Sequence, residues 1–192
     1  MGEKAPEQKK KKRGRKGKLR RDFFGISIYL LSVLILTYLL ITFVVQRTVV
    51  EGESMESTLS DGDNLLVEKL SYRVHHPRRF DVIVFPYSKE SRTYYVKRII
   101  GMPGETVFIN EHGDIFINDQ LLEEDYGEEV MRNPGLAGNT VYLKSNEYFV
   151  LGDNRNHSAD SRDPSVGNVT ADKIVGRAAF RTYPFSKWGK VK

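Results

Sequence analysis

The sequence contains no cysteine. This absence excludes disulfide bonds, a thiol nucleophile and cysteine-ligated zinc from the chemistry available to the chain. A fold without disulfides is also indifferent to whether it lies in a reducing or an oxidising compartment. The 192 residues are enough for one domain with accessory segments.

Charge is missing from one stretch of the chain and crowded into another. Residues 23–46 carry no charged side chain, whereas residues 1–22 hold 11 Lys and Arg against 3 acidic residues, a net charge of +8. The remaining residues carry a net charge of −3, so the basic sequence pI of 9.3 belongs to the tail. A charge block with so few apolar residues predicts that residues 1–22 are disordered.

The uncharged stretch predicts a transmembrane helix. As a helix, residues 23–46 would be about 36 Å long, enough to cross a hydrocarbon core of about 30 Å. The run is apolar on all faces, unlike most core helices. It is also too long for a cleavable signal peptide, and no small-x-small cleavage site follows it.

The Lys and Arg excess before this helix predicts the topology. It places the tail in the cytoplasm and residues 47–192 on the far side of the plasma membrane, as a single-pass protein. The basic tail could bind nucleic acid, but its place before a membrane helix favours a topological role with some attraction to anionic lipid. We therefore expect no nucleic-acid partner.

Residues 47–192 predict a mainly β fold. Runs rich in Val, Ile, Tyr and Phe and bounded by turn residues indicate strands at 64–70, 81–87, 94–100 and 147–153. Residues 105–122 predict a hairpin, and the acidic segment 123–140, which bears Gly and Pro, predicts a surface excursion. The expected fold is an antiparallel β-sheet catalytic domain outside the membrane, preceded by one transmembrane helix.

Two serines in EGESMESTL, residues 51–59, are candidate nucleophiles. A serine hydroxyl is a weak nucleophile and needs a base within hydrogen-bond reach. Among the four histidines, only His157, in LGDNRNHSADSR, is not expected at the surface. Lys97, in YYVKRIIGMPG, is the other candidate base. Its pKa would have to fall from about 10.4 to near 7, which burial against apolar atoms can supply. The residues alone leave open whether Lys97 faces solvent instead.

Five stretches occur in the order and spacing of the sequence boxes of type I signal peptidases, and the chain resembles that family. They are GESMESTL (52–59), DGDNLLV (61–67), FDVIVF (80–85), KRIIGMPGE (97–105) and LGDNRNHSADSR (151–162). The resemblance implies a membrane-bound serine endopeptidase that removes signal peptides from exported preproteins through an acyl-enzyme. It further implies that no cofactor or metal is needed. The implied partners are signal peptides with small residues at the −1 and −3 positions, the lipid bilayer and the secretion machinery.

The resemblance also implies a role for each matching residue. Ser54 matches the nucleophile, Lys97 the general base, and Ser158 a hydroxyl that helps to orient the lysine amine. Gly52 and Met55 match positions at the oxyanion and the substrate cleft. With glycine at the first of these, the oxyanion must rely on backbone N–H groups, that of Ser54 first. A supporting turn and a structural ion pair are matched by Gly152, Asp153, Asn154, Arg155, Asp160 and Arg162.

The chain departs from the family pattern after the nucleophile. The family has proline where this chain has Ser57, so Ser57→Pro is expected to leave activity equal or higher. The segment 163–167 is read as a loop insertion.

Two other functions remain open. One is a catalytically weak or inactive, membrane-tethered β domain that binds peptides. The other is a self-cleaving Ser–Lys repressor relative, against which the membrane helix and the missing DNA-binding half argue.

Overall fold

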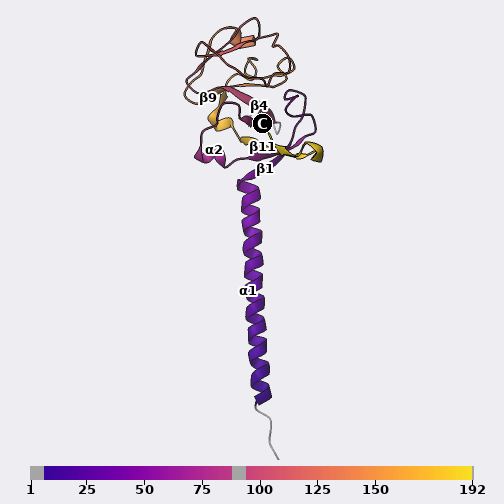
Figure 1. The fold of residues 1–192 in the computed structure, drawn as a ribbon. Helices are drawn as coiled ribbons and strands as arrows, with labels where there is room; N and C mark the ends of the chain where they lie inside the picture. Colours follow the sequence, from indigo (N-terminus) through magenta and orange to yellow (C-terminus); the bar gives the residue numbers. More distant parts are fainter. Residues whose placement is uncertain (1–6, 88–93, 192) are drawn as a thin grey trace, which may run out of the picture. The chain divides into compact units, whose positions relative to one another are not determined.

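The computed structural model describes residues 7–87 and 94–191, and the chain divides into two units that meet between Phe43 and Val44. The first unit is helix α1 (Glu7–Phe43), drawn in indigo and violet in Figure 1. It contains the segment Arg21–Leu39, which has a mean hydropathy of 1.9. That segment is long and apolar enough to cross a membrane.

The structure differs from the sequence prediction at both ends of this helix. Residues 7–22 are helical, although disorder was expected there, and residues 1–6 lie outside the described residues. Lys, Arg, Gln and Glu have high helix propensity, and extending an existing helix avoids the cost of nucleation. The helix also ends at Phe43 rather than at 46, because the chain from Val45 onward pairs with another strand.

The second unit consists of antiparallel strands in two sheets, which confirms the predicted fold class. The order across the larger sheet is β1-β2-β11-β3-β4-β9-β10, with β12 paired to β11. Its strands are β1 (Val45–Val49), β2 (Asn64–Glu68), β3 (Val82–Pro86), β4 (Tyr94–Gly101), β9 (Glu147–Leu151), β10 (Val169–Thr170), β11 (Gly176–Tyr183) and β12 (Gly189–Lys190). The short helices are α2 (Ser71–Val74), η1 (Gly135–Gly138), η2 (Ala171–Lys173) and η3 (Phe185–Lys187).

The smaller sheet has the order β7-β6-β5-β8 and is the pink to orange ribbon beyond β4 and β9 in Figure 1. Its strands are β5 (Thr106–Ile109), β6 (Ile115–Ile117), β7 (Gln120–Leu121) and β8 (Val141–Tyr142). Strands β5 and β6 pair antiparallel, with Val107 opposite Ile117 and Ile109 opposite Ile115. The hairpin predicted at 105–122 is therefore confirmed.

Strand β3 is buried on both faces of the larger sheet. Val82 and Val84 pack into one apolar cluster together with Met55, while Ile83 and Phe85 pack into another. This alternation follows from the two-residue period of a strand. Because β4 lies next to β3, its central side chains are enclosed as well, charged ones included.

The segment 123–140 is only partly the surface excursion that was predicted. Val130 is 73% exposed, but Met131 and Ala137 are buried in the core beside the smaller sheet. The acidic composition of the segment concealed these two anchoring positions. The segment is therefore anchored to the domain through Met131 and Ala137.

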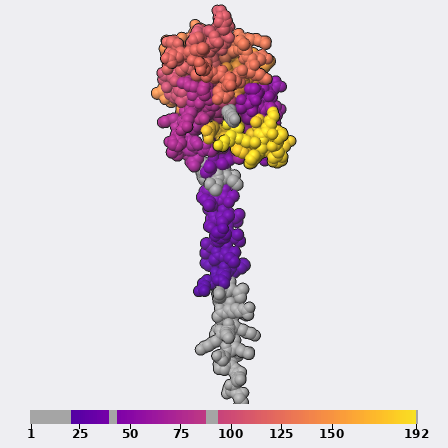
Figure 2. Space-filling view, in the orientation of Figure 1, coloured from indigo at the N-terminus to yellow at the C-terminus, as the bar shows by residue number. Residues whose placement is uncertain are grey.

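Strand β11 was not predicted, although it lies inside the larger sheet between β2 and β3. Its sequence GRAAFRTY mixes small and charged residues, so it lacks the apolar run by which the other strands were recognised. After β11 the chain reaches the surface, where it is yellow in Figure 2 and exposes Phe185 and Trp188.

Candidate active site

Ser54 lies in a tight loop between β1 and β2. The backbone N–H of Leu59 donates to the carbonyl of Met55 at 2.7 Å, and the Met55 side chain is 1% exposed, so the loop is anchored in the core. Gly52 has φ +88°, a left-handed conformation that glycine adopts without strain. Its N–H donates to Asp61 Oδ1 at 2.7 Å. Gly52 therefore helps to fix the loop, and its N–H is already used by Asp61.

The structure brings Ser54 and Lys97 together. Lys97 lies on β4 opposite Ile83 of β3, and only 2% of the residue is exposed. Its Nζ donates to Ser54 Oγ at 2.7 Å and to the Val96 carbonyl at 3.1 Å. The same nitrogen lies 4.9 Å from the centroid of the Tyr95 ring. A serine hydroxyl and a buried amine thus meet at hydrogen-bond distance, as a Ser–Lys dyad requires.

Burial lowers the pKa of Lys97 to about 8, although the carboxylates of Asp160 and Asp153 act in the opposite direction. Desolvation disfavours the charged ammonium, and here it outweighs the attraction of the two acids. With a pKa near 8, about one Lys97 side chain in ten is neutral at pH 7, compared with about one in 2,500 for a solvated lysine. Lys97 can therefore act as a base near neutral pH.

Arg98 follows Lys97 and points to the opposite face of β4. It is fully buried and forms an ion pair of 2.7 Å with Asp153. Asp153 is one of the residues that the family resemblance assigns to the supporting turn. Its Nη1 donates to the Phe80 carbonyl at 2.9 Å, and its guanidinium lies 3.6 Å from the centroid of the Tyr126 ring. No role for Arg98 was foreseen. The signal in the sequence was the pair of adjacent charged residues, Lys97 and Arg98, in an apolar strand. Neighbouring side chains point to opposite faces of a strand, so the protein must supply a polar partner on each face.

The turn after β9 holds the nucleophile loop by its backbone. Asn154 donates from its N–H to the Ser54 carbonyl at 3.1 Å and from Nδ2 to the Glu53 carbonyl at 3.1 Å. A Cβ on Gly152 would lie 2.6 Å from Ser158 Cβ and would overlap both Ser158 Oγ and the Ser54 carbonyl oxygen. Glycine is therefore required at residue 152 by close approach rather than by backbone conformation.

The expected ion pair between Asp160 and Arg162 is present, with both guanidinium contacts at 2.8 Å. Asp160 is fully buried and also accepts the N–H of Gly152 at 3.1 Å. Arg162 donates to the Arg155 carbonyl at 2.6 Å, and Arg155 pairs with Glu124 at 2.6 Å. These contacts tie the turn after β9 to the segment 123–140.

Ser158 is not joined to the lysine amine in this structure. Its Oγ is buried and has no hydrogen-bond partner among the residues that the structure describes. The Val96 carbonyl and the Tyr95 ring hold the amine instead. The alternative base, His157, is exposed, and its backbone N–H donates to the Asn154 carbonyl.

A cleft of about 230 Å³ opens over the dyad and is lined by residues 50–55 and 94–97 with His157 and Ala159. Strand β4 pairs with β3 over Tyr94–Arg98, while its pairing with β9 starts at Arg98. Within the described part of the chain, the second backbone edge of residues 94–97 therefore carries no strand and faces the cleft. No group of three His, Asp or Glu side chains suited to a metal ion occurs among the described residues.

The expectation for Ser57→Pro is reversed by the backbone of the loop. Ser57 has φ +77°, whereas proline fixes φ near −65°. We now expect Ser57→Pro to destabilise the domain by about 1–3 kcal/mol and to lower peptide cleavage. Ser57→Gly, the matched control, should retain both properties because glycine accepts positive φ. Thermal unfolding followed by circular dichroism, beside cleavage rates, checks this. Unchanged stability and activity in Ser57→Pro would show that the loop adopts another path.

The chain matches one protein family and several known proteins. Residues 24–183 match the family described as "Signal peptidase, peptidase S26". Signal peptidase I P of Bacillus subtilis subsp. natto is 40% identical over 152 residues, which cover 75% of this chain and 80% of that protein. Probable signal peptidase I-1 of Synechocystis is 37% identical over 149 residues, covering 74% and 73% of the two chains.

Two further matches extend the comparison. Probable signal peptidase I-2 of Synechocystis is 36% identical over 145 residues, and the match spans 64% of that protein. The crystal structure of a signal peptidase I from Enterococcus faecalis is 32% identical, with a TM-score of 0.44. That match covers 54% of this chain and 97% of the crystallised one.

Proposed function

The chain belongs to the signal peptidase I family, peptidase S26, and we propose that Ser54 and Lys97 are the nucleophile and general base of its reaction. The family activity is that of a serine endopeptidase that removes signal peptides from secreted preproteins. The observation that carries the residue assignment is the 2.7 Å contact between Lys97 Nζ and Ser54 Oγ. A buried lysine on a serine hydroxyl favours catalysis over a peptide-binding domain without activity, because binding alone does not require an amine that is buried at the cost of its desolvation.

Catalysis begins when the neutral amine of Lys97 accepts the proton of Ser54 Oγ. The oxygen then bonds to the carbonyl carbon of the scissile peptide, and the backbone N–H of Ser54 stabilises the negative charge on the carbonyl oxygen. The ammonium returns the proton to the leaving amine, the C–N bond breaks, and an ester remains on Ser54. Lys97 next removes a proton from water, the resulting hydroxide attacks the ester, and Ser54 recovers its proton as the signal peptide leaves.

The substrate enters as an added strand. The unpaired edge of residues 94–97 beside the cleft offers backbone groups to an extended peptide, as in β-augmentation. Alternate side chains of an extended peptide point to one face, so those at −1 and −3 enter the cleft together. Met55, Tyr95 and Val96 supply apolar walls there, and the family resemblance implies small side chains at −1 and −3.

The pH dependence of activity follows from the pKa of Lys97. The reactive amine is neutral, so kcat/KM should rise with pH up to about 8 and level off above that value. Between pH 7 and pH 6 it should fall about tenfold, because the neutral fraction falls by that factor. His157→Ala should keep this profile and stay within about threefold of the original rate. If the fall of kcat/KM at low pH disappeared in His157→Ala, histidine would be identified as the base.

Membrane topology is the second part of the proposal. The charge block of residues 1–22 precedes the only described helix that is long and apolar enough to span a bilayer, which supports a cytoplasmic N-terminus. A protease added outside intact cells should then digest the β domain and spare the tail. Immunoblots against each end of the chain report this result. A protected β domain, with lysed cells as the control for protease access, would reverse the orientation.

The experiment that tests the function uses the detergent-solubilised full chain and a synthetic signal peptide. Mass spectrometry of the products should show one cleavage, directly after the small residue at −1. Ser54→Ala should show none, while its circular dichroism spectrum stays unchanged. Cleavage by Ser54→Ala at the original rate would remove Ser54 from the mechanism.

A further inference from the structure

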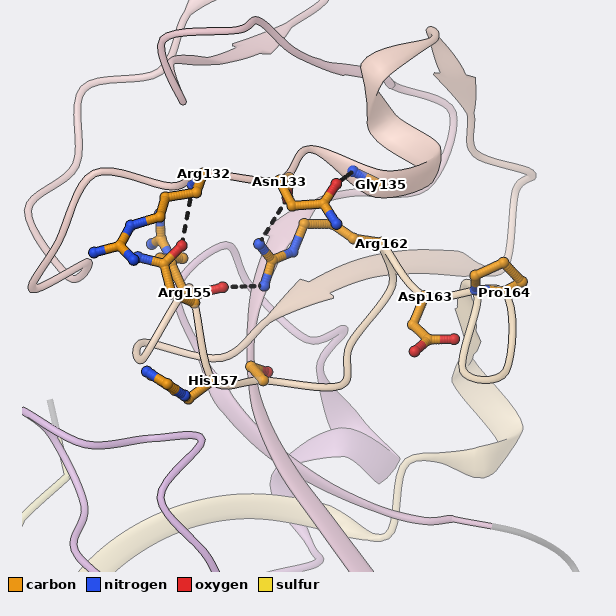
Figure 3. A pocket seen from close by; sticks show the side chains of 10 residues that line it. Arg132, Asn133, Gly135, Arg155, His157, Arg162, Asp163 and Pro164 are labelled. Atoms are coloured by element: carbon orange, nitrogen blue, oxygen red, sulfur yellow. Dashed lines mark hydrogen bonds between the residues drawn. The ribbon is translucent and has the colours of Figure 1, made fainter.

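A second cavity adjoins the cleft. It has a volume of about 420 Å³, and His157 lines both hollows. Three arginines contribute to its wall: Arg132, Arg155 and Arg162. In Figure 3, Arg132 and His157 end on one side of the view, and Asp163 and Pro164 on the other. The cavity therefore has a guanidinium donor, that of Arg132, on the side where His157 ends.

The three arginines differ in how far their donors are used. Arg162 is satisfied by Asp160, the Asn133 carbonyl and the Arg155 carbonyl. The Arg155 side chain is only 4% exposed; its Nε donates to the Gly152 carbonyl and its Nη1 to Glu124. Its Nη2 is buried and has no hydrogen-bond partner among the described residues. Buried donors are rarely left unpaired, so the wall of the cavity holds a guanidinium with one unused hydrogen-bond donor beneath its surface.

Arg132 is the exposed member of the group. Its side chain is 79% exposed, and the ion pair that it forms with Glu129 at 3.4 Å is itself exposed. Such a pair contributes little and leaves the guanidinium free to reorient. Asp163 provides the opposing charge in the cavity, where its Oδ1 accepts the backbone N–H of Ser165. Arg132 can thus close over an anion that enters beside His157.

We propose that this cavity is a subsite for an acidic side chain on the mature side of the scissile bond. The proposal rests on the proposed function, in which the signal-peptide side fills the cleft along residues 94–97. The chain beyond the scissile bond must leave Ser54 by another path, and the cavity that begins at His157 adjoins the cleft there. A carboxylate fits because it accepts two parallel hydrogen bonds from a guanidinium.

The test compares peptides that share one signal sequence and differ only after the cleavage point. Glu, Gln or Lys is placed in turn at each of the first four mature positions. The full chain in detergent is assayed beside Arg132→Gln, Arg132→Glu and a control, Arg78→Gln, which changes an exposed arginine that lines neither hollow. Arg132 is chosen rather than Arg155, because loss of a buried ion pair would disturb the fold. The backbone bond from the Arg132 N–H to Asn156 survives these changes.

At one or two positions the Glu peptide should be cleaved up to about fivefold faster than the Gln peptide in kcat/KM, mainly through a lower KM. This preference should vanish in Arg132→Gln and at about 1 M salt, and Arg132→Glu should prefer Lys. Arg78→Gln should behave as the original protein. Equal cleavage of Glu and Gln peptides at all four positions overturns the subsite alone. A Glu preference that survives in Arg132→Gln does the same. Failure to cleave any peptide overturns the proposed function and the subsite with it.

Discussion

Replacing Lys97 by methionine should abolish peptide cleavage while the domain stays folded. Methionine has a similar length and no charge, so it suits a site that is 2% exposed. Without an amine, no base accepts the Ser54 proton, and a loss of about 10²–10⁴-fold or more is expected. Lys97→Arg should be equally inactive, because a guanidinium stays protonated at working pH. Arginine is also bulkier, so the methionine variant is the cleaner measurement.

The matched control for this result is Lys144→Met, which removes an amine whose side chain is 79% exposed on the surface. It should cleave at the original rate. Peptide-cleavage kinetics and circular dichroism on both variants separate loss of the base from loss of the fold. Near-normal activity in Lys97→Arg would contradict the role of Lys97 directly.

Gly152→Ala is the second change expected to have a large effect. The new Cβ would lie 2.6 Å from Ser158 Cβ and would overlap the Ser54 carbonyl oxygen, so the backbone of the nucleophile must shift. A displacement of about 1 Å at a reacting group can cost about 10²-fold in rate. We expect a loss of that size in kcat, with a smaller change in KM.

The matched control for the glycine change is Gly138→Ala. At Gly138 a new Cβ would lie 3.2 Å from Pro134 Cγ, the nearest atom of a neighbouring side chain. A proline ring can move by the few tenths of an ångström that this contact requires. This variant should keep its activity, measured with the same peptide. If Gly152→Ala cleaved as fast as Gly138→Ala, the close approach around Ser54 would not matter for catalysis.

Strands with continuous apolar runs could be located from the sequence, because burial on both faces selects β-branched and aromatic residues. Strand β3 is the clearest example. Strand β11 could not be located this way, since its place in the sheet depends on pairing with distant β2 and β3. Local propensity carries little information about such long-range pairing.

The contact between Lys97 and Ser54 was predictable because a lysine in an apolar strand and a serine in a family motif are both visible in the sequence. The supporting contacts were less visible. Arg98 finds Asp153 and the Tyr126 ring across more than 25 residues of chain, and only the folded packing brings them together. The positive φ of Ser57 is a property of the loop that a serine does not reveal. The missing hydrogen bond between Ser158 Oγ and the Lys97 amine likewise depends on side-chain packing.

The most direct test of the central claim, that Ser54 attacks the substrate and Lys97 takes its proton, is to trap the acyl-enzyme. The full chain in detergent is mixed with a signal peptide, quenched with acid after a short time and mapped by mass spectrometry. A transient mass equal to the signal-peptide part should appear on Ser54 alone, and it should be absent from Lys97→Met. An acyl group on another residue, or its undiminished formation in Lys97→Met, would contradict the dyad.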